Sequence, residues 1–283
     1  PVDPDWLEKE EKKKEEKPKK ILDVPKGRIK ASQLKPITHT TLINTLSKGF
    51  KESANDKRYV RYPTTKQPVL KFNGSQKLED YGVANIKTKE IRRKTRYGRL
   101  ISINKYEYSD RDFAAINVLT NEINDLCKKY NVQNLRGYKR MAKSNAIADM
   151  GDGVMGLNIK FLRLDGQAIS PKSTWKFGDS VNAKPFSSSS YFDDPLDKIR
   201  STFYHELGHH IHQQKFVKTV DDYMKPLIER KMFGKIIKNK SATRYANKNP
   251  QEWFAENFSL YHMDREDLVD PEWIKFFKEN VDV

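Results

Sequence analysis

The chain has 283 residues, of which 36% are hydrophobic and 33% are charged, so part of it is expected to lie outside any hydrophobic core. Its formal net charge of +16 divides into +13 for residues 1–100 and +3 for residues 101–283, which places the basic character in the N-terminal third. The single cysteine, Cys127, excludes an internal disulfide and a zinc site made of several thiolates. No apolar run approaches the roughly 18 residues of a membrane span, so we expect a soluble chain with no such span.

The N-terminal third is expected to carry little globular structure. Residues 1–30 are predicted to be a charged tail, helical or disordered, because seven acidic and seven basic side chains crowd the first 20 positions. Residues 31–100 are predicted to be a basic linker with local structure. Its last ten residues, IRRKTRYGRL, include five basic side chains and no acidic one, which is typical of a solvated surface or of contact with a nucleic acid or another acidic surface.

From about residue 101 the pattern becomes that of a globular domain, predicted to extend to residue 283. Residues 101–103 alternate like a strand, and residues 112–130 have the apolar spacing of an amphipathic helix. Cys127 lies on the apolar face of that helix and is predicted to be a buried structural side chain. Residues 146–164 have the pattern of a strand, a glycine-rich turn and a strand, and residues 165–191 are predicted to be a long loop.

A helix is predicted to begin at Pro195, because Asp194 is a preferred N-cap residue and proline is favoured at the first helical position. This helix contains the sequence His205-Glu206-Leu207-Gly208-His209. Histidines at positions i and i+4 project from one helix face and can reach one Zn²⁺, while Glu206 beside them can reach a zinc-bound water. The alternative is a set of surface side chains, but the amphipathic and capped helix favours metal binding. His210 and His212 point to other faces and are not expected to be ligands.

A second predicted helix can complete the metal site, since two histidines leave a catalytic zinc short of one protein ligand. Asn249-Pro250 is again an N-cap pair, and Glu252 and Glu256 follow on one helical face. One of them can bind the metal while the other holds the free ring nitrogen of a ligating histidine. The residues alone leave open which is which, and a surface acidic pair is the alternative.

The combination of HELGH, Tyr245 and the segment EWFAENF resembles the gluzincin metallopeptidases that include the catalytic domain of anthrax lethal factor and the Pro-Pro endopeptidases. The resemblance covers about residues 146–262, and residues 1–100 match no family. It implies a zincin-like α+β domain with a small mixed sheet, an HExxH helix and a C-terminal glutamate helix. It also implies one Zn²⁺ per chain, with Glu252 as the third ligand, Glu256 supporting a zinc-binding histidine, and Tyr245 stabilising the oxyanion.

In zincins generally, a strand before the metal helix lies at the sheet edge and pairs with extended substrate. The best candidate for that strand has two glycines, which would let another backbone approach, although an ordinary sheet strand is the alternative. These predicted substrate-binding residues are Gly153, Val154, Met155, Gly156 and Leu157. In the implied mechanism Glu206 takes a proton from the zinc-bound water, which attacks the scissile carbonyl.

The sequence therefore predicts a zinc-dependent endopeptidase acting on a protein or peptide substrate, for whose chemistry residues 1–100 should be dispensable. Two alternatives stay open. One is a repressor-cleaving zinc protease, although the interval between HELGH and Asn249 is long for that group. The other is a basic nucleic-acid-binding or virion structural protein that carries a zincin domain. Because the sequence begins at Pro1, we expect a processed product or part of a longer polypeptide. The sequence does not determine the localisation, and secretion and association with a virion are both compatible with such an origin.

Overall fold

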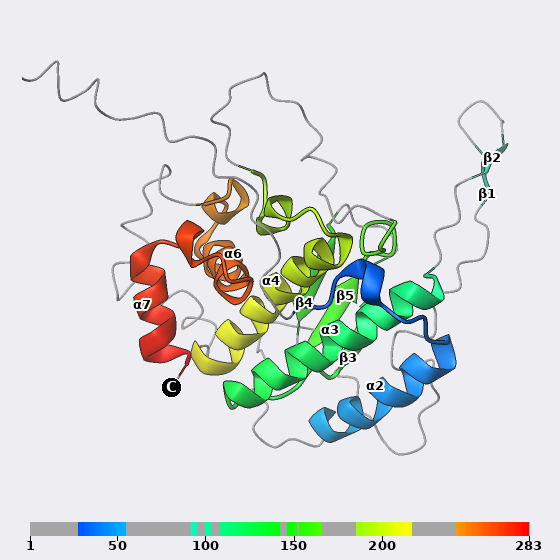
Figure 1. Ribbon diagram of the computed structural model, residues 1–283, viewed down its shortest axis with the longest axis horizontal. Coiled ribbons are helices and arrows are strands. Elements are labelled where there is room, and N and C mark those ends of the chain that lie inside the picture. Colours follow the sequence, from blue (N-terminus) through cyan, green and yellow to red (C-terminus); the bar gives the residue numbers. More distant parts are fainter. Residues whose placement is uncertain are drawn as a thin grey trace, which may run out of the picture.

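The computed structural model describes residues 28–54, 92–94, 100–102, 108–141, 146–151, 153–165, 185–216 and 242–282. Within these ranges the chain is an α+β protein with five α-helices and a three-stranded sheet (Figure 1). The helices are α2 (His39–Ala54), α3 (Asp110–Lys129), α4 (Pro195–Phe216), α6 (Pro250–His262) and α7 (Pro271–Asn280). None of these helices is long and apolar enough to cross a membrane. Of the predicted tail, residues 1–30, the first 27 lie outside the described residues.

The main helices begin at side-chain caps that the sequence predicts. At the start of α4 the carboxylate of Asp194 accepts a hydrogen bond from the backbone of Leu196 at 2.9 Å. Asn249 accepts from the backbone N–H of Glu252 at 2.9 Å at the start of α6. Both caps satisfy amide groups that the first helical turn leaves without a partner. Both predicted helix starts are therefore confirmed, and the caps fix where the functional side chains of α4 and α6 lie along each helix.

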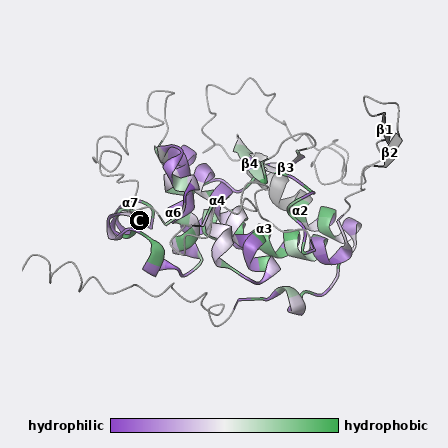
Figure 2. Ribbon diagram, turned by 90° about the horizontal axis from the view of Figure 1, so that it is seen from above, coloured by the Kyte–Doolittle hydropathy of each residue, from purple (hydrophilic) through white to green (hydrophobic). Residues whose placement is uncertain are grey.

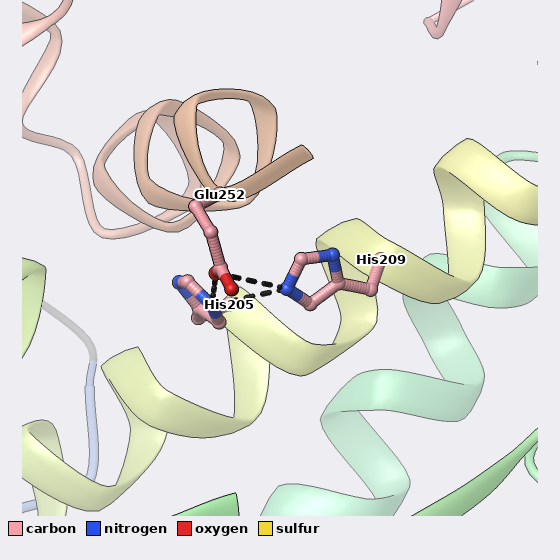
Figure 3. A group of neighbouring side chains, drawn as sticks. All are labelled: His205, His209 and Glu252. Atoms are coloured by element: carbon pink, nitrogen blue, oxygen red, sulfur yellow. Dashed lines mark hydrogen bonds and ion pairs between the residues drawn. The ribbon is translucent and has the colours of Figure 1, made fainter. Parts of the chain in front are cut away.

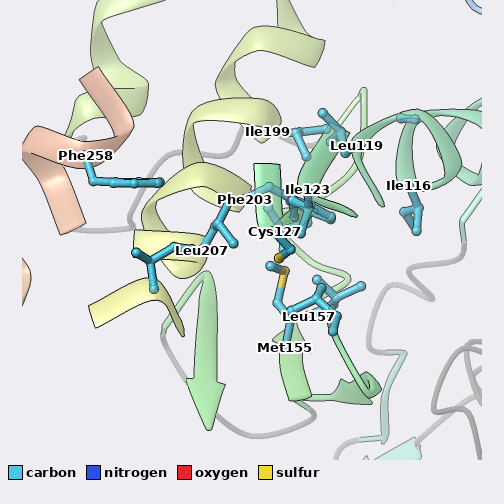
Figure 4. Packing of buried hydrophobic residues seen from close by; sticks show 14 of the residues in the cluster. Ile116, Leu119, Ile123, Cys127, Met155, Leu157, Ile199, Phe203, Leu207 and Phe258 are labelled. Atoms are coloured by element: carbon cyan, nitrogen blue, oxygen red, sulfur yellow. The ribbon is translucent and has the colours of Figure 1, made fainter. Parts of the chain in front are cut away.

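The hydrophobic core is one cluster that joins α3, α4, α6 and the sheet, with α6 packed on α4 (Figure 4). Hydrophobic and hydrophilic residues alternate along α3 (Figure 2), which buries its apolar face, whereas α4 is buried on almost every side, many of its polar residues included. Gly208 lets α4 and α6 approach closely, because a Cβ atom at this position would lie 3.0 Å from the Cα atom of Ala255. Cys127 is fully buried, and burial raises the pKa of its thiol to about 12. The prediction of a structural cysteine is confirmed.

The three-stranded sheet consists of β3 (Gly137–Arg140), β5 (Val154–Leu157) and β4 (Ala148–Gly151), in that order. Strand β5 runs parallel to β3 and antiparallel to β4. The expectation that residues 153–157 form an edge strand is therefore wrong, because both sides of β5 are already paired. Strand β4 lies at one edge of the described sheet, beside α4.

The two glycines that suggested an edge strand have other reasons to be there. Gly153 follows β4 in the hairpin turn and has a φ of 73°, a left-handed conformation that glycine adopts without strain. Gly156 faces Asp149 across the β4–β5 pair, and a Cβ atom at position 156 would overlap the Asp149 carboxylate. That carboxylate reaches over the central strand to the ammonium group of Lys139, 2.9 Å away on β3. Gly156 thus makes room for a side chain of its own sheet.

Part of the predicted linker belongs to the core. Helix α2 packs against α3, and Leu42, Ile43 and Leu46 are at most 3% exposed. Further upstream, the guanidinium group of Arg28 donates to the backbone carbonyl of His262 at 2.8 Å, at the end of α6. The predicted domain boundary at residue 101 is therefore too late. The short apolar patch of α2 has too few residues to suggest a buried helix without knowledge of the surface that covers it.

The basic stretch before residue 101 contributes to a short hairpin. Strand β1 (Arg92–Lys94) pairs antiparallel with β2 (Leu100–Ser102). The strand predicted to start at Ile101 is thus present, while position 103 lies outside the described residues. Contact of this region with a nucleic acid or another acidic surface stays a prediction.

Candidate metal centre

Three side chains from α4 and α6 converge on one point. His205 and His209 present their Nε2 atoms 3.2 Å apart, one helical turn from each other. The Oε2 atom of Glu252 lies 3.1 Å from the first nitrogen and 3.3 Å from the second. Figure 3 shows the carboxylate of Glu252 descending from α6 between the two imidazole rings of α4. The predicted meeting of these three residues is confirmed.

The spacing of the three donor atoms fits a small divalent cation. A tetrahedral ion with ligand distances of 2.0–2.1 Å requires its ligand atoms to lie about 3.3 Å from one another. The observed edges of 3.1–3.3 Å match this requirement without any rearrangement of the side chains. Two imidazoles and one carboxylate also leave a fourth tetrahedral position open, which is the arrangement of catalytic rather than structural zinc sites. The group can therefore hold a metal ion.

The same convergence concentrates charge. Burial lowers the pKa of His205, but the carboxylates of Glu252 and Glu256 raise it by a larger amount. The pKa of His205 therefore lies well above its ordinary value. Burial raises the pKa of Glu252, but hydrogen bonds to His205 and His209 outweigh burial and hold this pKa far below its ordinary value. The site therefore favours positive charge at the point where the three ligand atoms meet.

The second nitrogen of His205 faces Glu256. Its Nδ1 atom lies 2.8 Å from Oε1 of the carboxylate, a short charged contact. The other oxygen of Glu256 accepts a hydrogen bond from the backbone N–H of Ser188 at 2.6 Å. A carboxylate in this position favours the tautomer with the proton on Nδ1 and leaves Nε2 free to bind a metal.

Behind Glu256 lies a buried chain of hydroxyl groups that the sequence analysis missed. The hydroxyl of Ser201 donates to that of Ser188 at 3.0 Å and lies 2.9 Å from the hydroxyl of Ser259. These three side chains are at most 2% exposed. A signal was available, since Ser201 stands four residues before His205 and Ser259 three residues after Glu256, on the faces of α4 and α6 that meet.

Glu206 is buried between the ligands and a pocket. It is 5% exposed and lines the pocket together with His205. Burial raises the pKa of its carboxyl group, and the neighbouring His205 and His209 oppose this shift. A carboxyl group with a raised pKa beside an open metal position is suited to exchange protons with a water or substrate there.

Tyr245 reaches the same site from the loop before α6. Its hydroxyl donates to Oε1 of Glu252 at 3.2 Å, and its ring centroid lies 5.8 Å from that of His205. Its backbone N–H donates to the carbonyl of Phe186 at 2.8 Å, which ties the tyrosine to the segment opposite. Burial and the charge of Glu252 raise the pKa of the phenol above its ordinary value. Tyr245 is therefore protonated and can act as a hydrogen-bond donor.

A pocket with a volume of about 280 Å³ opens beside Glu206 and Tyr245. Its far wall is formed by residues 146–148, which lead into and begin β4, and the segment 186–189 closes another side. The predicted substrate residues 153–157 do not line it. The strand that faces the pocket is thus the neighbour of the strand that the sequence analysis selected.

The other two histidines of α4 are buried in the core and lie on other faces of the helix than His205 and His209, as expected. His210 is fully buried and its Nε2 atom lies 2.7 Å from the backbone carbonyl of Gln133, to which it donates. His212 packs against the ring of Phe254 at a centroid distance of 5.1 Å. Burial lowers the pKa of both imidazoles, to about 3 for His212. Neither joins the metal ligands.

Comparison with known proteins adds no assignment to this geometry. No protein-family model matches the chain, and neither a curated protein nor a solved structure matches it.

Proposed function

We propose that the chain is a zinc-dependent endopeptidase with a zincin-like domain, which hydrolyses peptide bonds of a protein or peptide substrate. The observation that carries this proposal is the triangle of ligand atoms from His205, His209 and Glu252, with edges of 3.1–3.3 Å. Glu206 and Tyr245 flank this triangle and face the same pocket. An isolated metal site would not need a buried acid and a phenol at its open side.

The roles of the side chains follow from their positions. A zinc ion in this site supplies Lewis acidity, which lowers the pKa of a water and polarises a carbonyl group. Glu206 accepts the proton of the attacking water at its carboxylate and delivers it to the amine of the leaving peptide. Tyr245 turns its hydroxyl from Glu252 toward the oxygen of the scissile carbonyl, where negative charge develops.

Substrate binding is assigned to β4 in place of the strand selected from the sequence. Among the described strands, β4 pairs only with β5, so its outer side offers backbone groups to an extended peptide. The segment that begins β4 also forms a wall of the pocket. A peptide paired there would pass in front of Glu206 and place one side chain in the pocket.

The proposal is tested by separating metal binding from turnover. Glu206→Gln should keep about one zinc per chain and lose peptide cleavage by orders of magnitude, because the amide cannot accept the proton. Glu252→Gln should lose zinc, since a neutral amide is a poor replacement for a charged ligand. Zinc is measured by mass spectrometry after dialysis, and cleavage with a pool of quenched-fluorescence peptides. The matched control is Glu279→Gln, which changes an exposed carboxylate on α7.

Cleavage by Glu206→Gln at the wild-type rate would contradict the role of this residue. A wild-type protein that retains no zinc after loading would contradict the metal centre itself. The control variant should match the wild type in zinc content and cleavage.

A further inference from the structure

Lys248 extends over the metal site from the loop that carries Tyr245. Its Nζ atom donates a hydrogen bond to the hydroxyl oxygen of Tyr245 at 3.3 Å and lies 5.0 Å from the centroid of that ring. It also forms an ion pair with Oε1 of Glu252 at 3.7 Å. Among the described residues that line the pocket, Lys248 is the only lysine or arginine.

Local backbone geometry places these side chains together. Tyr245 starts the short helix η7 (Tyr245–Asn247), and the backbone N–H of Lys248 donates to the carbonyl of Tyr245 at 3.0 Å. In a turn of this kind, side chains three residues apart lie above one another. Asn249 then caps α6, whose first turn carries Glu252. Tyrosine, lysine and metal ligand therefore come from one continuous stretch of eight residues.

The hydrogen bonds run in one direction, from Lys248 to Tyr245 and from Tyr245 to Glu252. A phenol oxygen that accepts from an ammonium group gives up electron density, so its own proton is donated more strongly. The ammonium group also lies close enough to Oε1 of Glu252 to balance its charge when the phenol turns away. The second effect would favour the position in which the phenol faces a substrate oxygen, because the carboxylate that it leaves stays balanced by the ammonium group.

We propose that Lys248 is a positioning residue for Tyr245, which releases the phenol from Glu252 and strengthens its hydrogen bond to the oxyanion during peptide hydrolysis. This inference rests on the proposed endopeptidase function. It assigns to Lys248 a role in the transition state that requires the hydroxyl of Tyr245. A lysine that only stabilises the fold, or that only attracts acidic substrates, would not depend on that hydroxyl.

The test is a double-mutant cycle in the full chain, with zinc loaded and the fastest-cleaved quenched-fluorescence peptide as substrate. Lys248→Met should lower kcat by about three- to tenfold with little change in KM, as expected for a partly exposed charge acting in the transition state. In the Tyr245→Phe background the same change should have almost no further effect, because the acceptor hydroxyl is gone. Lys248→Arg should restore most of the rate, since it keeps a cationic donor.

The matched control is Lys275→Met, which removes an exposed lysine from an i,i+4 pair on α7 and should leave kcat unchanged. Zinc content and melting temperature should stay at wild-type values in all single variants, because the Lys248 side chain is 58% exposed. A loss of rate that is equally large with and without the Tyr245 hydroxyl would overturn the inference, as would an unchanged kcat in Lys248→Met. A wild-type protein that binds zinc but cleaves no peptide would instead contradict the endopeptidase function together with this inference.

Discussion

Glu256→Gln should weaken metal binding although Glu256 does not touch the metal position. The two carboxylate oxygens have different main partners, Nδ1 of His205 at 2.8 Å for Oε1 and the backbone N–H of Ser188 at 2.6 Å for Oε2, and Oε1 also accepts a longer hydrogen bond from the Ser188 hydroxyl at 3.4 Å. Glutamine has one carbonyl oxygen and one NH₂ group, so it can satisfy only one of these donors. If its oxygen faces Ser188, its NH₂ group faces the imidazole and favours the tautomer with the proton on Nε2, which cannot bind a metal. If the amide is flipped, two donors meet at Ser188.

The size of the effect follows from this choice. Either orientation sacrifices one buried hydrogen bond or requires a change of tautomer, which costs about 1.4–2.8 kcal/mol and corresponds to a 10–100-fold loss of metal affinity. The loss should be far smaller than that caused by Glu252→Gln, which removes a ligand atom. Nothing else at the metal position changes, since the three ligand atoms keep their helices and their caps.

The assay is competition for Zn²⁺ between the protein and a chromophoric chelator at pH 7.5, with melting temperatures measured for the metal-free proteins. Glu279→Gln serves as the control for removal of a carboxylate from an exposed position. Wild-type affinity in Glu256→Gln would refute the argument that this carboxylate selects the tautomer of His205. An affinity as low as that of Glu252→Gln would also refute it, because the two glutamates would then have exchanged roles.

Two further outcomes test the fold. Leu42→Ala should lower the free energy of unfolding by about 2–5 kcal/mol, because Leu42 is fully buried. Thr45→Ala, on the exposed face of α2, should change this free energy little. Equal effects of the two substitutions in denaturant titrations would contradict the packing of α2. Burial lowers the pKa of His262 from 6.5 to about 3, so the folded state binds fewer protons than the unfolded one between these values, and stability should fall by up to about 1.4 kcal/mol per pH unit as the pH drops from 6.5 toward 3. His262→Gln should flatten that decline, and an unchanged slope would show that His262 is not held neutral.

Features that depend on short-range geometry could be predicted from the sequence. A capping residue acts on the next two or three amides, and histidines four residues apart lie on one helix face in any α-helix. The starts of α4 and α6 and the pairing of His205 with His209 could therefore be predicted. The absence of His210 and His212 from the metal ligands follows from the same periodicity.

Features that depend on how two elements pack together could not be predicted in the same way. Glu252 and Glu256 share one face of α6, and the periodicity treats them alike. Helix α6 approaches α4 closely at Gly208. In this arrangement Glu252 lies on the Nε2 side of His205, and Glu256 lies on its Nδ1 side. No local sequence pattern predicts how two helices cross. Without the family resemblance, the residues therefore did not show whether Glu252 or Glu256 is the third ligand.

The position of a strand within its sheet, and the burial of an isolated helix, are also non-local. Strand β5 has the same composition whether it is central or at an edge, and only its pairing with both β3 and β4 excludes substrate from it. Leu42, Ile43 and Leu46 of α2 become part of the core because α3 presents a matching surface. Lys248 gains its place over Tyr245 because η7 ends directly at the cap of α6, a junction that requires both elements to be folded.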